Sequence, residues 1–377
     1  MSEDSQTEID MSVATVLETV DRAVAELRRG SAVVVTSDSG AVLARPAETI
    51  ESGPLPFFGR SGLGKTAVAV TGRRAAILGL AEPATPVVIL RHEDGFNAAD
   101  IRNLIDPKAD DNTLVPPPNV QASAGDEHSA DYTAIRLMKI ARLLPAAIVA
   151  DVADENPVSW AKSNGRCIVS HTAVLAYDKL QADTLVPVSE ARVPLAGCEN
   201  TRIIAFRPRD GGVEHLAIIV GEPDTSTAVL TRLHSECFTG DLLGSLKCDC
   251  GDQLRGAISA LAEGDGGVLL YLAQEGRGIG LVNKLRAYEL QERGFDTVDA
   301  NEQLGFDDDE RIYLPAVQML SSLGINKVKL LTNNPAKVGA LARHGITVTE
   351  RVTHVFPSNQ HNWSYLDTKS KRSGHLF

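Results

Sequence analysis

Three cysteines in a short polar stretch constrain this chain more than any other feature of its 377 residues. Cys237, Cys248 and Cys250 follow the spacing C-x10-C-x-C. The other two cysteines, Cys167 and Cys198, lie apart from them. Thiolates suit zinc, and three of them leave the fourth tetrahedral position open, as in a catalytic zinc site. A water molecule at that position would have a pKa lowered towards neutrality and would become a nucleophile.

Two other interpretations of these cysteines stay open. Free cysteine often packs as a small apolar residue, but the neighbours Lys247, Asp249 and Asp252 are not typical of a core. The second alternative is a structural four-cysteine site that adds Cys198. The spacing alone supports a metal site and no specific reaction.

Composition excludes several classes of protein. A chain of this length predicts about two domains at roughly 100–200 residues each, and 43% hydrophobic residues allow a full core in both. The net charge of −12 argues against a general nucleic-acid or anionic-membrane surface, so an anionic substrate would need a local basic pocket. The polar, acidic start predicts no secretory signal, and no run reaches the ~18–20 apolar residues that span a membrane. A thiolate site with few cysteines indicates the reducing cytoplasm.

The first half of the chain predicts a mixed order of helices and strands. Ser12 is a suitable helix N-cap, apolar residues then recur on one helical face, and Gly30 ends the helix. We expect further helices over 73–80, 98–105 and 134–143, and strands over 32–36, 41–44, 67–70 and 87–90. The stretch 106–129, rich in Pro, Asp, Asn and Gly, predicts a long exposed loop. The expected fold class is α/β (α+β).

Residues 59–66 match the P-loop pattern G-x-x-x-x-G-K-T. A P-loop needs a strand before it and a helix after it, whereas here a poor strand precedes it and a strand-like run follows. The pattern therefore indicates a glycine-rich turn that enters a strand.

The second half is expected to begin with a linker over 186–200 and strands over 202–206, 215–220 and 229–233. A strand over 268–272 then feeds the glycine loop 274–281 and a helix over 282–293, an arrangement that can hold a phosphate. A sterically required turn is an equal alternative. Another strand, 327–331, feeds Thr332 and a helix that begins at Pro335 with Lys337 in its first turn. Thr332 and Lys337 could hold a second anionic group, or Thr332 could belong to a plain N-cap. The acidic run 307–311 is typical of a solvated loop.

The first half resembles 3,4-dihydroxy-2-butanone 4-phosphate synthase. The resemblance rests on 20–35 (VDRAVAELRRGSAVVV), 46–49 (PAET), 134–148 (AIRLMKIARLLPAAI) and a late segment, 168–177. The dense acidic stretch that follows the first strand in that family is replaced by Ser37-Asp-Ser-Gly40, and the His-Thr-Glu metal segment has no match near His128. The resemblance therefore implies a degenerate domain that keeps the fold and has lost the synthase activity.

The second half resembles GTP cyclohydrolase II over a dense and collinear series of motifs. The main ones are 232–241 (RLHSECFTGD), 246–251 (LKCDCG), 274–281 (QEGRGIGL), 283–288 (NKLRAY) and 330–335 (LLTNNP). The resemblance implies hydrolysis of GTP to 2,5-diamino-6-ribosylamino-4(3H)-pyrimidinone 5′-phosphate, formate and pyrophosphate, the first committed step of riboflavin biosynthesis. It also implies one zinc ion (Zn2+) per subunit, magnesium (Mg2+) with the GTP phosphates, and a homodimer.

The resemblance also assigns roles to individual residues. Cys237, Cys248 and Cys250 correspond to the zinc ligands, and Tyr288 to a residue near the metal-bound water. The implied substrate contacts are Arg232, Leu233, His234, Ser235, Glu236, Gln253, Glu275, Gly276, Arg277, Thr297, Thr332 and Lys337. Arg311 corresponds to a proposed nucleophile at the α-phosphate and Asp309 to its proton acceptor. Because a guanidinium stays protonated, Arg311 is better suited to clamp a phosphate.

One position departs from the family pattern. Ala273 stands before Gln274, where family members often have Arg, and its presence removes one cation near the phosphates.

The resulting expectation is a disordered segment 1–12, a synthase-like domain 13–188 and a cyclohydrolase domain 189–377. The alternatives are a variant that retains C8 as a formamide, a catalytically silent nucleotide sensor or scaffold, and, more remotely, a zinc-dependent nucleic-acid module. The first is disfavoured by Tyr288, the second by the filled catalytic positions and the third by the acidic charge.

Overall fold

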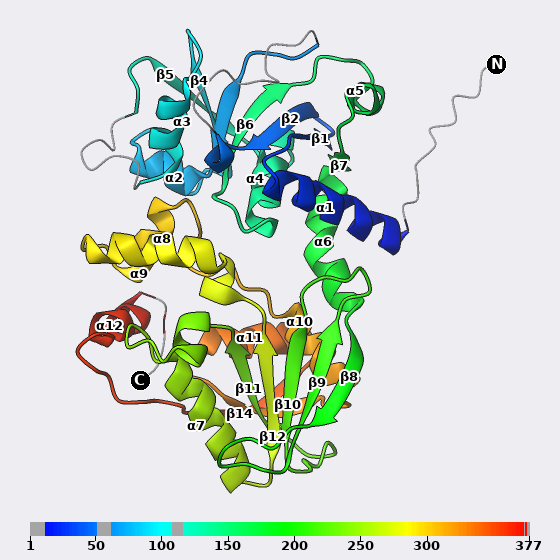
Figure 1. Cartoon of the computed structure of the whole chain (residues 1–377), viewed down its shortest axis with the longest axis vertical. Coiled ribbons are helices and arrows are strands. Elements are labelled where there is room, and N and C mark those ends of the chain that lie inside the picture. Colours follow the sequence, from blue (N-terminus) through cyan, green and yellow to red (C-terminus); the bar gives the residue numbers. More distant parts are fainter. Residues whose placement is uncertain (1–11, 51–61, 108–115, 373, 375–377) are drawn as a thin grey trace, which may run out of the picture.

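Two mixed sheets of seven strands each, covered by helices, organise the chain (Figure 1). The computed structural model describes residues 12–50, 62–107, 116–372 and 374. The predicted α/β fold class is confirmed. The segment expected to be disordered, 1–12, lies outside the described residues except for Ser12, whose side chain caps the first helix. Across the described residues no helix is long and apolar enough to cross a membrane.

The first sheet has the strand order β5-β4-β3-β6-β2-β1-β7. Its strands are β1 Val33–Ser37, β2 Gly40–Pro46, β3 Ala67–Val70, β4 Val87–His92, β5 Val120–Gly125, β6 Ala146–Asp151 and β7 Ile168–Ser170. Its helices are α1 Val13–Arg28, η1 Ala47–Thr49, α2 Gly72–Ile77, α3 Ala98–Ile105, α4 Ala130–Ile140, α5 Pro157–Ser163 and α6 His171–Asp183. One face packs on α1, α4 and α6, and α2 and α3 cover the other.

The second sheet has the order β14-β13-β11-β12-β10-β9-β8. Its strands are β8 Val186–Arg192, β9 Thr201–Arg207, β10 His215–Val220, β11 Val229–Ser235, β12 Gly267–Leu272, β13 Lys327–Leu331 and β14 Thr347–Val352. Strands β14, β13, β11 and β12 are parallel neighbours, and β10, β9 and β8 extend the sheet in antiparallel fashion. Helix α7 Cys250–Glu263 packs on one face, and α10 Leu314–Ser322 and α11 Pro335–Arg343 on the other.

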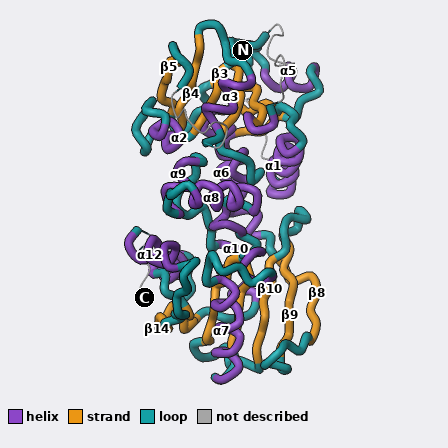
Figure 2. The backbone as a smooth tube through the Cα atoms, turned by 60° about the vertical axis from the view of Figure 1, so that its left-hand side comes forward, coloured by secondary structure: helices purple, strands orange, loops and turns teal. Residues whose placement is uncertain are grey.

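Two helices of the second half pack against the first half. Helices α8 Leu281–Glu292 and α9 Thr297–Gln303 follow β12 in the chain. Their apolar residues Leu290 and Ala300, with Leu304 and Phe306 just beyond, join the buried cluster formed by α2, α3 and the first sheet. Figure 2 shows α8 and α9 lying between the two sheets. The two halves therefore share one continuous core at this junction.

Two stretches expected to be irregular contain strands. The described part of the expected loop 106–129 includes β5, and the expected linker 186–200 begins with β8. Both are edge strands with mostly exposed side chains, so they lack the hydrophobic pattern that marks a strand. The expected boundary between 188 and 189 falls inside β8, and a division just before Val186 would keep the second sheet whole.

The P-loop-like segment is followed by strand β3, not by a helix. Its described part, 62–66, therefore has the inverted context that the sequence indicates, while 59–61 lie outside the described residues.

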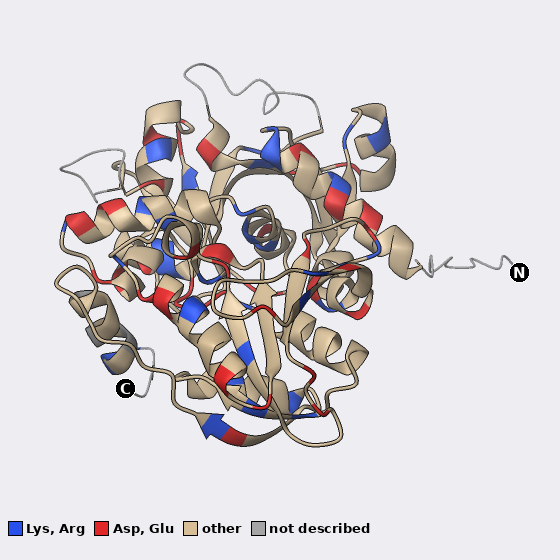
Figure 3. Cartoon of the chain, turned by 60° about the horizontal axis from the view of Figure 1, so that its bottom comes forward, with Lys and Arg blue, Asp and Glu red and all other residues tan. Residues whose placement is uncertain are grey.

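Charged residues are dispersed along the fold. In the view of Figure 3, Lys and Arg alternate with Asp and Glu along helices and strands of both halves. The acidic run 307–311 is a loop with Asp307 and Asp309 exposed, but its carboxylates make ion pairs: Asp307 pairs with Arg73 and Lys139 of the first half, and Asp308 pairs with Arg277.

Candidate active site

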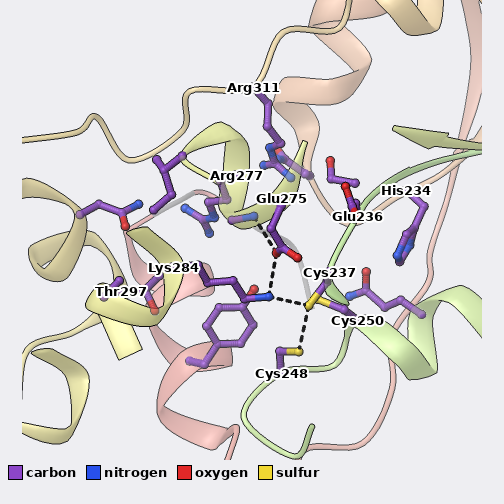
Figure 4. Close-up of a pocket in the computed structure, with 18 of the residues that line it drawn as sticks. His234, Glu236, Cys237, Cys248, Cys250, Glu275, Arg277, Lys284, Thr297 and Arg311 are labelled. Atoms are coloured by element: carbon purple, nitrogen blue, oxygen red, sulfur yellow. Dashed lines mark hydrogen bonds and ion pairs between the residues drawn. The ribbon is translucent and has the colours of Figure 1, made fainter. Parts of the chain in front are cut away.

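The carboxyl ends of parallel strands β11, β12 and β13 meet at one edge of the second sheet, where open α/β sheets bind ligands. The segments that leave these strands are the cysteine stretch 236–250, the glycine loop 273–280 and the turn 332–337. Together with α8, α9 and the C-terminal helix α12 Trp363–Lys371, they line one pocket (Figure 4).

The three predicted metal ligands converge in this pocket. Cys237 follows β11, and Cys248 and Cys250 stand at the start of α7. Their Sγ atoms all lie within 4.8 Å of one another, and those of Cys237 and Cys248 are 3.7 Å apart. Cys198 is not part of this group; it packs among apolar residues under the sheet. The described structure thus disfavours the four-cysteine alternative.

The chemistry of the three thiols fits a bound dication. Hydrogen bonds from Cys248 and Cys250, and the ammonium of Lys284, hold the pKa of Cys237 far below its usual range. The hydrogen bond to Cys237 raises the pKa of Cys248 to about 11, and the same neighbour raises the pKa of Cys250. Without a metal the cluster therefore favours one thiolate and two thiols. A zinc ion would stabilise all three as thiolates.

Gly240 allows the cysteine loop to close around the cluster. A Cβ atom at this position would lie 2.8 Å from the Sγ of Cys248 and 3.1 Å from the Sγ of Cys237. The glycine is therefore required because its neighbours approach the backbone so closely.

We expect Gly240→Ala to displace the thiols and weaken zinc binding. Loss of ideal geometry in a metal site costs about 10- to 100-fold in affinity, comparable to loss of a supporting contact. Competition with a chromophoric zinc chelator measures this. Gly244→Ala is the control, because a Cβ at Gly244 meets no atom within 4 Å, although its positive φ of 67° adds local strain. Equal zinc affinity in the two variants would contradict the proposed role of Gly240.

A buried carboxylate and ammonium tie the glycine loop to the cysteine loop. One oxygen of Glu275 accepts the backbone N–H of Phe238 at 2.7 Å, and the other accepts Lys284 Nζ at 2.8 Å. Lys284 Nζ also lies 2.9 Å from Cys237 Sγ (Figure 4). Burial lowers the pKa of Lys284, but hydrogen bonds to Cys237 and Glu275 outweigh it, and the net shift is upward. Lys284 is therefore a permanent cation beside the thiolate.

The glycine loop adopts left-handed backbone conformations. Gly276 has a φ of 64° and Arg277, a residue that rarely adopts this region, has a φ of 61°. Arg277 donates through Nη1 to Asp308 O at 3.1 Å, and the N–H of Glu310 donates to Arg277 O at 3.0 Å. Contacts with the acidic segment thus hold the strained loop, with Arg277 on the pocket wall.

The carboxylate of Asp241 anchors the end of strand β11 through hydrogen bonds. This carboxylate accepts the N–H of Cys237 and the hydroxyl of Tyr271, each at 2.9 Å, and contacts His234 Nε2 at 3.1 Å. Burial lowers the pKa of His234, so that this imidazole is neutral at pH 7.

Arg311 reaches the pocket as half of an ion pair. Its Nε and Nη2 donate to the two carboxylate oxygens of Asp309 at 2.7 and 2.5 Å. Burial opposes ionisation of both groups, but the hydrogen bonds and the opposite charges within the pair have a larger effect on the two pKa values. The pKa of Asp309 is lowered and that of Arg311 is raised. The guanidinium is therefore charged and correctly shaped to bind a phosphate.

The pocket lining includes two further buried cations, Arg232 and Lys337. Arg232 donates to Leu331 O at 3.0 Å and to the side chain of Gln253, while Lys337 Nζ donates to Leu233 O at 2.7 Å. The side chain of Leu233 packs in the sheet core, because alternate residues of a strand face opposite sides. The predicted contact at Leu233 can therefore involve only its backbone.

The pocket gathers most of the residues that the sequence predicts, together with others. Apart from Leu233 and Asp309, all the predicted metal, catalytic and substrate residues line it. The residues not predicted are Ile279, Lys284, Ala287, Gln291, Asn301, Asn333, Asn334 and Tyr365. Four of the lining positions, 284, 287, 288 and 291, follow helical spacing on α8, so Tyr288 could have led to its neighbours.

Comparisons with known proteins decide the family. A family model described as GTP cyclohydrolase II matches residues 186–353. A GTP cyclohydrolase-2 of Azospirillum brasilense is 53% identical over 365 residues, which cover 95% of this chain and 94% of that protein. The chain belongs to the GTP cyclohydrolase II family. A GTP cyclohydrolase-2 of Pseudomonas aeruginosa is 51% identical over 193 residues, 51% of this chain but 94% of that protein. Within the family, the second half therefore corresponds to nearly the whole of a shorter relative.

Among solved structures, a two-domain 3,4-dihydroxy-2-butanone 4-phosphate synthase from A. baumannii covers 89% of this chain and 99% of its own. The sequence identity is 16% and the TM-score 0.35.

Proposed function

We propose that the chain hydrolyses GTP to 2,5-diamino-6-ribosylamino-4(3H)-pyrimidinone 5′-phosphate, formate and pyrophosphate, and so serves riboflavin biosynthesis. Family membership supports this, and one observation carries it: three clustered thiols open into the same pocket as Arg277, Arg311 and Lys337. A named relative in Bacillus velezensis, 52% identical over 176 residues, is a riboflavin biosynthesis protein.

The thiol end of the pocket would open the imidazole ring of GTP. Zinc held by Cys237, Cys248 and Cys250 would supply a water nucleophile active at neutral pH. The hydroxyl of Tyr288 stays protonated because burial raises its pKa to about 12, so it can donate to the opened ring. Lys284 would keep Glu275 and the Cys237 thiolate in place during the reaction.

The cationic end of the pocket would bind the triphosphate. Arg277 and Arg311 offer forked donors, Lys337 adds a third charge, and magnesium would accompany the phosphates. We assign Arg311 as a clamp that stabilises charge at the α-phosphate. Asp309 would fix the orientation of the Arg311 guanidinium through two hydrogen bonds. The other predicted contacts, Arg232, His234, Ser235, Glu236, Gln253, Gly276, Thr297 and Thr332, would surround the base and ribose.

The first half is proposed to have lost synthase chemistry. Strands β1 and β2 form a tight hairpin in which Ser37 pairs with Gly40, which leaves no room for an acidic metal-binding stretch. With ribulose 5-phosphate and magnesium, we expect no butanone phosphate to form. Its detection by mass spectrometry, at a rate above a heat-denatured control, would overturn this proposal.

The assembly proposed is a cytoplasmic homodimer with one zinc ion per subunit and no nucleic-acid or membrane partner. Exposed apolar side chains within the cysteine stretch, Leu242, Leu243 and Leu246, support association, since such groups favour burial.

The decisive experiment follows formate, pyrophosphate and product mass together, with zinc-loaded protein, GTP and magnesium. Equal amounts of formate and pyrophosphate support the proposal. Pyrophosphate without formate would point to retention of C8 as a formamide. Bound GTP with neither product would replace the proposal by a nucleotide sensor.

A further inference from the structure

Arg142 of the first half touches both ends of the glycine loop of the site. Its Nη2 donates to Ala273 O at 3.0 Å, where β12 ends and the loop begins. Its own carbonyl accepts Asn283 Nδ2 at 3.1 Å, in the first turn of α8 where the loop ends. Asn283 is fully buried and also donates to Ile279 O inside the loop.

The backbone of the glycine loop approaches the side chain of Arg142 closely at Gly280. Gly280 has a φ of 86°, and a Cβ at that position would lie 3.1 Å from the Cβ of Arg142 and 3.2 Å from its Cδ. The arginine stem therefore occupies the space that any larger residue at 280 would fill.

Arg142 has an unfavourable backbone conformation at the position where it makes these contacts. It follows the last residues of α4 with a φ of 59°, at a position where helices prefer glycine. Such strain persists where the surroundings enforce it, and it tends to mark functional positions. A glycine here would relieve the strain, so stability of the helix end does not explain an arginine.

The same helix end also holds the segment that carries Arg311. Lys139, one turn earlier, pairs with Glu310 at 2.6 Å and with Asp307 at 3.3 Å. Thus α4 and the residues just beyond its end contact both loops that bring guanidinium groups to the pocket, although they contribute no residue to the pocket lining that the structure describes.

We propose that Arg142 is a positioning residue for the reaction of the second half: it fixes the glycine loop 273–280 in the conformation that presents Glu275 and Arg277. The first half then serves catalysis without chemistry of its own. The inference concerns the geometry of the loop, and its effect on turnover rests on the proposed function.

Arg142→Gly separates positioning from folding, because glycine suits the backbone. Hydrogen–deuterium exchange of the zinc-loaded protein should show amides in 273–284 exchanging about tenfold faster, roughly the factor lost with the one side-chain hydrogen bond to Ala273 O. The kcat/KM for GTP should fall about 10- to 100-fold, mostly through KM, with zinc content and thermal midpoint unchanged. Arg142→Lys should recover part of the loss.

Arg136→Gln is the matched control, on the helix that precedes Arg142. Arg136 pairs with Asp178 inside the first half at 3.2 Å, so its loss should leave loop exchange and turnover unchanged. Unchanged exchange in 273–284 for Arg142→Gly, or equal effects in both variants, would overturn the inference. If the wild-type protein fails to turn over GTP, exchange still tests Arg142 and only the proposed function falls.

Discussion

Cys248→Ser should abolish formate release, with a loss of at least about 1,000-fold, because zinc chemistry supplies several kcal/mol to such a reaction. A serine hydroxyl is a poor zinc ligand, and the thiol it replaces lies 3.7 Å from its partner Cys237. The bound zinc, measured by elemental analysis, should fall from one per chain towards zero. GTP binding, measured by calorimetry, should persist, since the cationic end of the pocket is untouched.

Cys198→Ala is the control that tests the four-cysteine alternative. Cys198 is buried among apolar residues outside the thiol cluster, so its truncation should cost a little stability and leave zinc and turnover intact. Loss of zinc in this variant would show that Cys198 is a ligand and that the site is structural.

Arg311→Lys should lower kcat by about 100- to 1,000-fold, the cost of losing one charge-stabilising donor in a preorganised site. Lysine keeps the charge but loses the fork that Asp309 holds in a plane. Zinc content should stay at one per chain. If Arg311 is a clamp, residual pyrophosphate release should be measurable in single-turnover experiments.

The alternative, in which Arg311 is the nucleophile, predicts that Arg311→Lys and Arg311→Gln abolish pyrophosphate release equally. Asp309→Asn separates the roles further. The folded pKa of Asp309 is depressed, so the stability of the pair is present above the ordinary Asp value and is lost only as pH falls through the lower folded value. The pair therefore persists at neutral pH. For a clamp, Asp309→Asn should cost less than Arg311→Gln.

Elements with strong periodicity were predictable from the sequence. Strands β3, β10 and β13 and helix α3 have the expected bounds, because buried runs and an Asn97 capping box mark them locally. The edge strands β5 and β8 were not, since their pairing depends on neighbours distant in the chain. The packing of α8 and α9 on the first half was not predictable for the same reason, because it depends on residues distant in the chain.

The residues of the candidate site also divide into those that the sequence predicted and those that it did not. Motif resemblance led to the cysteines, the glycine loop and Arg311, which the structure gathers in one pocket. It did not lead to Tyr365, which α12 brings to the pocket from 115 residues beyond Cys250, or to Arg142. Such residues act through tertiary contacts, and their own sequence neighbourhoods carry no catalytic pattern.

The shared core between the halves bears on how such a chain evolves. Leu290, Leu304 and Phe306 are each about 1% exposed where they meet the first half. A deletion of that half would expose these side chains at a cost of about 1.5–3 kcal/mol each. Removal of the first half would therefore carry a cost in stability, and this cost alone can preserve the fold of the first half, whatever chemistry it performs.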